Sequence, residues 1–410
     1  MCFEYGTTSM RPAAVRAAGP REAEGLSNGT SAIAVLILAG FVLSWRGDTP
    51  AAQKTVLDFG ARCDGVSVDN AAFLAALAAT GSAVVPENRV CVVDRLEIPG
   101  NSRIRGVDNQ TSVIKAGPGN NIFTFTGTAT AHKADLSIEN LSFLPLTGAN
   151  VPGTVVLNAI YADNVSMLHN ISTEIQLLCS NREFPYWKVL PAWLNRNTTF
   201  SGNVCRSRQV KHDACGEFAY VDGVTARNNM VYGFRDALFY WGGDADKTGA
   251  ASNPRWARNV DFTGNYVDGS NGGIWGSMGQ GVLFSMNTVR NLQDVGIDFE
   301  GTVDGKAIGN TCTEAIHGCA TVFFLNRKIV FTGNTITQSN AAHPLLRLYG
   351  STLPGKNEDI SITRNTFYCT DRKHTCVIDN QSGKFRGLLF SGNSLSHTTV
   401  ELGAKNFRVP

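Results

Sequence analysis

Two short segments, "VDFTGNYV" (residues 260–267) and "VLFSMNTV" (282–289), share one pattern, and this pattern decides the fold. Each has an apolar residue, then an aromatic residue two positions on, an Asn three positions later, and a final apolar residue. Further copies, in which Ile can replace the aromatic residue, are "IVFTGNTI" (329–336), "ISITRNTF" (360–367) and "LLFSGNSL" (388–395), with weaker copies at 224–231 and 305–312. The alternation predicts strands with one buried face, and the Asn falls where each strand ends.

The spacing of the shared Asn is that of a solenoid. It recurs as Asn229, Asn265, Asn287, Asn310, Asn334, Asn365 and Asn393. Spacings of 22–24 residues correspond to one coil of a parallel β-helix, and the longer spacings to a coil with a loop. Stacked Asn side chains can hydrogen-bond one another and the turn backbone, and stacked coils bury a core that one coil cannot. The alternative, a β-sandwich with Asn-rich turns, does not explain a single Asn register at this spacing.

The segment 56–106 begins differently from the repeats. It predicts one amphipathic helix, with Phe73, Leu74 and Leu77 as its apolar stripe and Gly81 at its end. Short strands follow the helix. We expect this helix to cover the open N-terminal end of the solenoid.

A family resemblance starts in the same segment. "DFGARCDGVSVDNAAFLAALAAT…AVVPENRVCVV" resembles the opening of right-handed parallel β-helix proteins of the pectate-lyase-like superfamily, including rhamnogalacturonase-like and epimerase-like members. The resemblance covers about 50 residues and implies an all-β, single-stranded right-handed parallel β-helix with an N-terminal capping α-helix. It also implies an enzyme that cuts or modifies polysaccharide. The "NTD", "DD" and "GHG" motifs of polygalacturonases and the "WIDH" and "RxPxxR" motifs of pectate lyases are absent from the sequence, so those named activities are not supported.

Residues 1–50 do not fit the repeat. They contain an apolar run of twelve residues, "AIAVLILAGFVL" (32–43), which is shorter than the roughly 20 residues of a membrane-spanning helix and fits a signal peptide. We expect residues 1–50 to be a leader outside the fold, a cleaved signal peptide in preference to a signal anchor. Residues 51–410 then form the β-helix domain of a secreted or cell-surface protein.

Cysteine usage agrees with export. The chain has ten Cys, none with zinc-site spacing, so disulfides are favoured over a metal. The proposed pairs are Cys63 with Cys91, Cys205 with Cys215, Cys312 with Cys319, and Cys369 with Cys376; the two seven-residue pairs should staple turns within single coils. A net charge of +2 with interspersed acids and bases gives no reason to expect nucleic acid or an anionic membrane as a partner.

The Asn register aligns the strand that follows each turn. Leu238, Ile274 and Ile297 share one offset from their Asn and should stack inside. Their neighbours should face outward as one strip: Phe239 and Trp241, Trp275 and Ser277, Asp298 and Glu300, Arg347 and Tyr349, and Asp379. For the coil of Asn310, either His317 or Thr321 could stand in the strip. Arg235 and Asp236 are interpreted as loop structure, with side chains on opposite faces.

This strip has the composition of a carbohydrate-binding groove. Asp298 and Glu300 lie two residues apart on one face and are the predicted catalytic carboxylate pair, with Asp294 as a third member. Repulsion between two close acids should raise one pKa and separate an acid from a base. The predicted substrate-binding residues are Trp241, Trp275, Phe239, Arg347, Tyr349, Asp379 and His317. The segment 173–222 breaks the repeat, and we expect it to be a loop excursion that walls the groove, against which Trp241 and Trp275 could simply pack.

The leading functional interpretation is a glycoside hydrolase acting on an exported polysaccharide. A polysaccharide lyase is the second interpretation: His317 or Tyr349 would remove the proton next to a uronate, with Arg347 or calcium neutralising the acid. A non-catalytic glycan-binding surface protein is the third. The hydrolase needs no cofactor, although the acidic cluster also suits calcium. The sequence is compatible with a monomer or a homotrimer and does not identify the sugar.

Overall fold

The computed structural model describes residues 53–119, 121–146, 154–181, 189–208, 214–245, 254–349, 357–380 and 385–402. The described residues from Lys54 onward form one compact unit. The expected leader, residues 1–50, lies outside the described residues. No helix in the described part is both long and apolar enough to cross a membrane.

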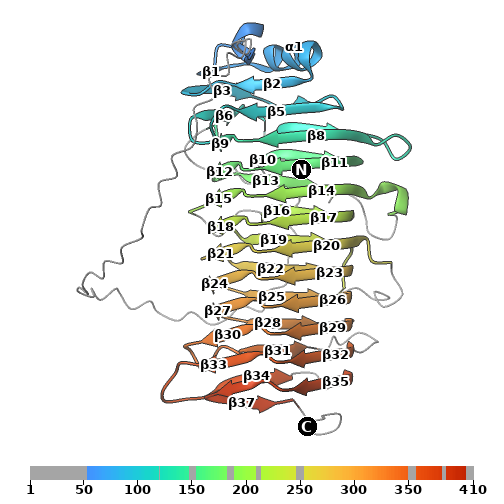
Figure 1. The fold of residues 1–410 in the computed structure, drawn as a ribbon, viewed down its shortest axis with the longest axis vertical. Helices are drawn as coiled ribbons and strands as arrows, with labels where there is room; N and C mark the ends of the chain where they lie inside the picture. The colour runs from blue at the N-terminus through green and yellow to red at the C-terminus, as the bar shows by residue number, and fades with distance from the viewer. Residues whose placement is uncertain are drawn as a thin grey trace, which may run out of the picture. The chain divides into compact units, whose positions relative to one another are not determined.

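The unit is a parallel β-helix, as the repeat predicts. Within it the chain passes repeatedly through three parallel sheets, here called A, B and C, so that successive coils stack (Figure 1). From residue 82 onward each full coil runs through sheet B, then sheet A, then sheet C.

Sheet A contains β1 (Asp64–Val68), β3 (Arg89–Val93), β6 (Ser112–Ala116), β9 (Ser142–Leu144), β12 (Ile171–Thr173), β15 (Val204–Arg206), β18 (Met230–Tyr232), β21 (Tyr266–Asp268), β24 (Thr288–Leu292), β27 (Thr311–Ala315), β30 (Thr335–Gln338), β33 (Thr366–Cys369) and β36 (Ser394–Ser396). Sheet B contains β2 (Ser82–Val85), β5 (Ser102–Gly106), β8 (Lys133–Glu139), β11 (Ala162–Leu168), β14 (Asn195–Ser201), β17 (Val221–Arg227), β20 (Ala257–Thr263), β23 (Gly279–Ser285), β26 (Val303–Ile308), β29 (Arg327–Thr332), β32 (Asn357–Thr363) and β35 (Phe385–Ser391). Sheet C contains β4 (Leu96–Glu97), β7 (Asn121–Thr126), β10 (Val155–Ile160), β13 (Gln176–Ser180), β16 (Ala214–Ala219), β19 (Asp236–Trp241), β22 (Gly272–Ser277), β25 (Val295–Glu300), β28 (Gly318–Phe323), β31 (Leu346–Tyr349), β34 (Cys376–Asn380) and β37 (Thr398–Glu401).

The repeated Asn forms the predicted ladder at the turn from sheet B to sheet A. The Asn287 side chain illustrates the bonding: its Nδ2 donates to the Phe262 carbonyl at 2.8 Å and to Asn310 Oδ1 at 2.9 Å, and its Oδ1 accepts from Asn265. The same contacts run from Asn170 through Asn203 to Asn393. The residue before the ladder Asn has a positive φ, for example 68° at Gly264, which explains the Gly in the repeated "TGN".

The core is one buried cluster that extends through the described coils. Aromatic rings stack in its middle, with Phe284 between Phe262 (5.5 Å) and Phe299 (4.8 Å). The helix α1 (Asn70–Thr80) lies at the end of the stack that holds the first strands (Figure 1), between the short 3-10 helix η1 (Val56–Phe59) and β2.

The capping helix is confirmed, with one change to its apolar stripe. Phe73 and Leu77 belong to the main core cluster, whereas Leu74 is 42% exposed. Gly81 ends the helix in the left-handed conformation, as expected.

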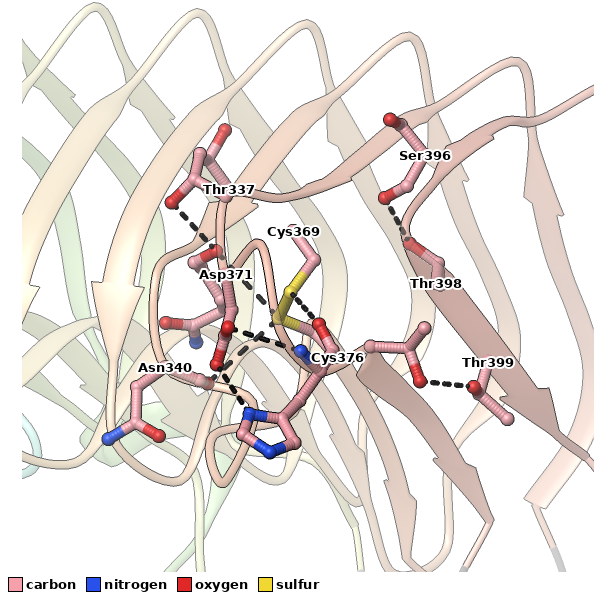
Figure 2. Close-up of a disulfide and its surroundings, with 12 residues drawn as sticks. Thr337, Asn340, Cys369, Asp371, Cys376, Ser396, Thr398 and Thr399 are labelled. Carbon is pink, nitrogen blue, oxygen red and sulfur yellow. Dashed lines mark hydrogen bonds and ion pairs between the residues drawn. A yellow bond between two sulfur atoms is a disulfide. The ribbon is translucent and has the colours of Figure 1, made fainter.

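All four proposed cysteine pairs form disulfides. Three of them join a sheet A strand to the first or second residue of the next sheet C strand, and the fourth joins Cys63 to Cys91 in β3. Figure 2 shows the Cys369–Cys376 bridge between β33 and β34, with Asp371 in the enclosed loop accepting hydrogen bonds from the backbone of Lys373 and His374. The seven-residue pairs therefore staple turns within single coils, and four disulfides fit an oxidising, extracytoplasmic compartment.

The expectation of a loop excursion over 173–222 is wrong for the described residues. They contribute β13, β14, β15 and β16 to the sheets, and Asn203 takes its place in the ladder. The irregularity comes from insertions at the corners of these coils, including a segment that carries the 3-10 helix η2 (Pro191–Trp193). Insertions at corners leave the strand register intact, which is why the coils continue through this region.

Candidate active site

The outer face of sheet C carries the predicted strip in the predicted register. Leu238, Ile274 and Ile297 pair in sequence across β19, β22 and β25 and belong to the core cluster. The next position on each strand forms what we call the Asp298 column: Phe239, Trp275, Asp298, Thr321, Arg347 and Asp379. Two residues further lies the Glu300 column: Trp241, Ser277, Glu300, Phe323 and Tyr349.

The coil of Asn310 places Thr321 in the Asp298 column. His317 instead lies just before β28, at the corner between sheets A and C, where its Nδ1 is 2.8 Å from Asp294 Oδ1. Asp294 occupies the equivalent corner one coil earlier, just before β25. The structure therefore brings two predicted residues, Asp294 and His317, together at the edge of sheet C.

The aromatic end of the Asp298 column is held by ring stacking and by hydrogen bonds. The rings of Phe239 and Trp275 stack with centroids 5.2 Å apart and planes 9° from parallel. The Trp275 indole Nε1 donates to Asp236 Oδ1 at 3.0 Å. Arg235 Nε donates to the other Asp236 oxygen, also at 3.0 Å. The loop interpretation of Arg235 and Asp236 is therefore wrong for Asp236, which starts β19 and orients a predicted substrate-binding residue.

Asp298 has an environment unusual for an outward-facing carboxylate. It is 1% exposed, and its Oδ1 has no hydrogen-bond partner among the described residues. Burial raises the pKa of Asp298 to about 7. The Thr321 hydroxyl opposes this rise, the negative charge of Asp294 adds a smaller increase, and the Phe299 amide opposes it slightly. The acidic partner expected for this effect was Glu300, but Asp294 is the acid that raises this pKa. A carboxyl with such a pKa is protonated in a large fraction of molecules near neutral pH.

The Glu300 column borders a hydrophobic wall. Trp241 packs against a buried cluster formed by Val189, Leu194, Ala219, Tyr220 and Trp256, with Trp193 also in contact. A second cluster joins Ala245 to Met278 and Leu325. Val189, Leu194, Ala245 and Trp256 lie in the corner insertions that follow β13 and β19. The described parts of these insertions thus pack beside the Glu300 column at the corner between sheets C and B, and Trp241 contributes at least partly to packing.

The basic end of the strip contains a partly buried ion pair. Arg347 Nε lies 3.5 Å from Asp379 Oδ2, in a geometry that makes no hydrogen bond, and the two side chains are 23% and 19% exposed. Tyr349 packs edge-on against Phe323 and Phe324. Arg347 therefore already has an acidic neighbour, but its Nε retains a free donor among the described residues.

In the described part of the chain, one group of three potential metal ligands has donor atoms within 4.8 Å of one another: Cys63, Asp69 and Cys91. The two sulfurs of this group form a disulfide, so they are not ligands. The acidic residues of the strip on sheet C do not form such a group within the same described ranges.

Comparison with known proteins places the fold but not the activity. No protein-family model matches the sequence, and no curated protein is similar to it at a significant level. The A-module of mannuronan C-5 epimerase AlgE6 from Azotobacter vinelandii resembles the chain with 15% identity and a TM-score of 0.51, and the match covers 85% of this chain and 99% of that one. Tailspike protein 3 of bacteriophage CBA120 resembles it with 15% identity and a TM-score of 0.53, over 87% of this chain and 61% of that one. The catalytic domain of a GH87 α-1,3-glucanase bound to nigerose resembles it with 12% identity and a TM-score of 0.51, over 84% of this chain and 66% of that one. These neighbours are right-handed parallel β-helix proteins, and the chain shares that fold.

Proposed function

We propose that this right-handed parallel β-helix protein is a polysaccharide-active enzyme, most specifically a glycoside hydrolase that uses the outer face of sheet C. The observation that carries the proposal is the Asp298 carboxyl, which is buried on an outer sheet face beside a stacked aromatic pair and has one oxygen without a partner. A buried carboxyl with a raised pKa suits a general acid, because burial favours the protonated form that the reaction needs.

Asp298 is the proton donor in this mechanism. In the fraction of molecules in which it is protonated near neutral pH, it donates to the glycosidic oxygen as the bond to the leaving sugar breaks. Glu300 stands two residues further along β25, so its Cα lies about 6.5–7 Å from that of Asp298. The partly exposed Glu300 then acts as nucleophile or as base toward water, and the anomeric form of the product distinguishes these two roles.

The remaining strip supports a chain-like substrate. The Asp298 and Glu300 columns run across successive coils about 4.8 Å apart, so they offer a row of contacts rather than one pocket. Trp275 and Tyr349 contribute aromatic surface, and Arg347 contributes a donor for hydroxyl or carboxylate groups. The printed titles of two structural neighbours name a mannuronan epimerase and an α-1,3-glucanase, which supports a polysaccharide as the substrate class.

The test is a panel of neutral and uronate-containing polysaccharides, assayed for new reducing ends and for ultraviolet absorbance, with and without a calcium chelator. We expect reducing ends without absorbance, and a loss of at least 100-fold in kcat for Asp298→Asn and for Glu300→Gln. Because the acid must be protonated, kcat/KM should fall as the pH rises above about 7. Unchanged turnover in both variants would refute the catalytic assignment, and binding without turnover across the panel would leave a glycan-binding protein.

One observation favours a lyase as the second candidate. His317 Nδ1 bonds to Asp294, and its Nε2 has no hydrogen-bond partner among the residues that the structure describes. A histidine held in this way can accept the proton next to a uronate carboxylate, with Arg347 or calcium neutralising the acid. The lyase predicts an absorbing, unsaturated product that disappears in His317→Gln, whereas the hydrolase predicts no such product.

A further inference from the structure

Trp275 lies between Phe239 and the Asp298 carboxyl. The three residues occupy matching positions on β19, β22 and β25, which are adjacent in that order in sheet C. Phe239 stacks on one face of the Trp275 ring, with nearly parallel planes. Because β22 separates β19 from β25, Asp298 lies on the opposite side of the indole. The indole is therefore the apolar neighbour that the preceding coil places beside Asp298.

A single polar contact fixes this indole. Trp275 Nε1 donates to Asp236 Oδ1, and Asp236 is itself only 6% exposed and held by Arg235. The space beside this hydrogen bond has no room for a side chain at position 272. A Cβ on Gly272 would lie 2.7 Å from Asp236 Oδ1 and 3.3 Å from Trp275 Nε1. Only a glycine at position 272 leaves the carboxylate and the indole free to meet.

We propose that Asp236 is a positioning residue of the candidate site, which holds the Trp275 indole beside Asp298 and thereby keeps water away from that carboxyl. The assignment of Asp298 as the catalytic acid rests on the proposed function, but the exclusion of water does not. Asp236 acts through Trp275 and touches no reacting atom.

Direct electrostatics is the competing explanation. The charged or titratable groups around Asp298 are Glu300 on its own strand, Asp294 and His317 at the corner, Arg347 on β31, and the buried Tyr240 hydroxyl on β19. Asp236 stands two strands away, about 9.6 Å across the sheet, and three residues out of register, roughly a further 10 Å along the strands. At that distance its negative charge would by itself raise the pKa of Asp298 slightly, so simple removal of the charge would lower it. A test must therefore separate the charge of Asp236 from its hydrogen bond.

Three variants make this separation. Asp236→Asn removes the charge but keeps an oxygen that can accept from the indole. Asp236→Leu removes both. Gly272→Ala leaves all charges in place and drives the Asp236 carboxylate away from the indole, and the φ of Gly272 is not in the left-handed region, so Ala adds no backbone strain there.

The readout is the titration of the Asp298 carboxyl, followed by NMR of protein labelled with 13C-aspartate and assigned by comparison with Asp298→Asn. Exchange of the Trp275 indole N–H with solvent is measured alongside. We expect Asp236→Leu and Gly272→Ala to lower the pKa of Asp298 by about one unit or more and to speed indole exchange, with Asp236→Asn close to the parent protein. Equal shifts in Asp236→Asn and Asp236→Leu, or no shift in Gly272→Ala, would overturn the proposal.

The same variants separate this inference from the hydrolase assignment. If the protein hydrolyses glycans, the alkaline limb of kcat/KM should move to lower pH in Asp236→Leu and Gly272→Ala, in step with the NMR titration. If the titration shifts as expected but no polysaccharide is cleaved, the positioning role stands and the hydrolase assignment fails. Should Asp236→Leu fail to fold, as judged by thermal unfolding, Gly272→Ala alone decides.

Discussion

At the scale of single residues, the burial of Asp298 makes the stability of the fold depend on pH. In the unfolded chain its pKa is near 3.8, and in the folded protein burial raises it to about 7. As the pH rises from about 4 to about 7, the unfolded state loses the proton while the folded state keeps it, so the free energy of unfolding falls. The protonated Asp298 carboxyl makes its full contribution to the free energy of unfolding below about pH 4, and this contribution is lost above about pH 7. The difference between the folded and unfolded pKa values corresponds to a contribution of at most on the order of 4 kcal/mol.

Asp298→Asn should therefore stabilise the protein while removing its acid. Asn has the same shape and does not titrate, so we expect its thermal midpoint to exceed that of the parent at pH 8 and to match it near pH 4. Asp304→Asn is the matched control: Asp304 is 48% exposed, lies 3.7 Å from Lys328, and has a φ of 56° that Asn tolerates. Its effect should be small at both pH values. An equal rise in the thermal midpoint of Asp298→Asn at pH 4 and at pH 8 would show that ionising Asp298 does not destabilise the folded protein, which would contradict its raised pKa.

At the scale of elements, the Asn ladder links each coil to the next. Each interior rung satisfies the backbone N–H and side-chain amide of the rung before it and a carbonyl of the preceding coil, in a place where water has no access. Asn265 and Asn287 are each 1% exposed. The loss of one interior rung leaves several buried polar groups unpaired, and this cost exceeds that of one average hydrogen bond.

Asn287→Ala should destabilise the protein by about 3 kcal/mol, measured by chemical denaturation. The ladder supplies its own control in Asn393, the last rung, which accepts from Asn365 but is only half-buried, so water can replace part of what it provides. For Asn393→Ala we expect about 1 kcal/mol. Similar losses at both positions would show that burial of the ladder contributes little to its strength.

Much of this architecture could be predicted from the sequence because the repeat fixes the register. Once Ile274 and Ile297 share an offset, the outward positions of Trp275 and Asp298 follow without further information. Asn203 was missed although "FSGNVC" (200–205) carries the same signal as "FSGNSL" (390–395), because the corner insertions around it obscured the spacing. The contact of Asp236 with Trp275 could not be predicted, since it depends on a side-chain conformation and on the space beside Gly272. The burial of Asp298 likewise depends on neighbours in other coils.

At the scale of the whole molecule, the described coils share one continuous core, and the first coil needs a cover. The helix α1 supplies it by burying Phe73, Ala76 and Leu77 against the same cluster as the coils. Without this cover, apolar side chains and strand edges at the first coil would meet solvent or another chain. The helix therefore protects the stack from end-to-end association.

Leu77→Lys should loosen this cover. A charge placed at a position that is 4% exposed cannot remain in the core, so we expect release of α1, faster limited proteolysis near residues 70–81 and concentration-dependent association in light scattering. Leu74→Lys lies on the same helix at a 42% exposed position and should leave both readouts unchanged. Identical behaviour of the two variants would mean that α1 does not cover the end of the solenoid. The light-scattering mass of the parent protein would also distinguish a monomer from a homotrimer.

The uninterrupted coils around Asp298 also have an evolutionary consequence. From Asn265 to Asn334 the rungs are separated by 22, 23 and 24 residues, with no corner insertion in any of these coils. An in-frame duplication or loss of one such unit would rejoin the ladder at an equivalent rung. Descendants of this gene can therefore lengthen or shorten the outer face of sheet C in steps of about 4.8 Å, the width of one strand, without redesigning the core. A longer or shorter face would suit longer or shorter stretches of the polymer that we propose as substrate.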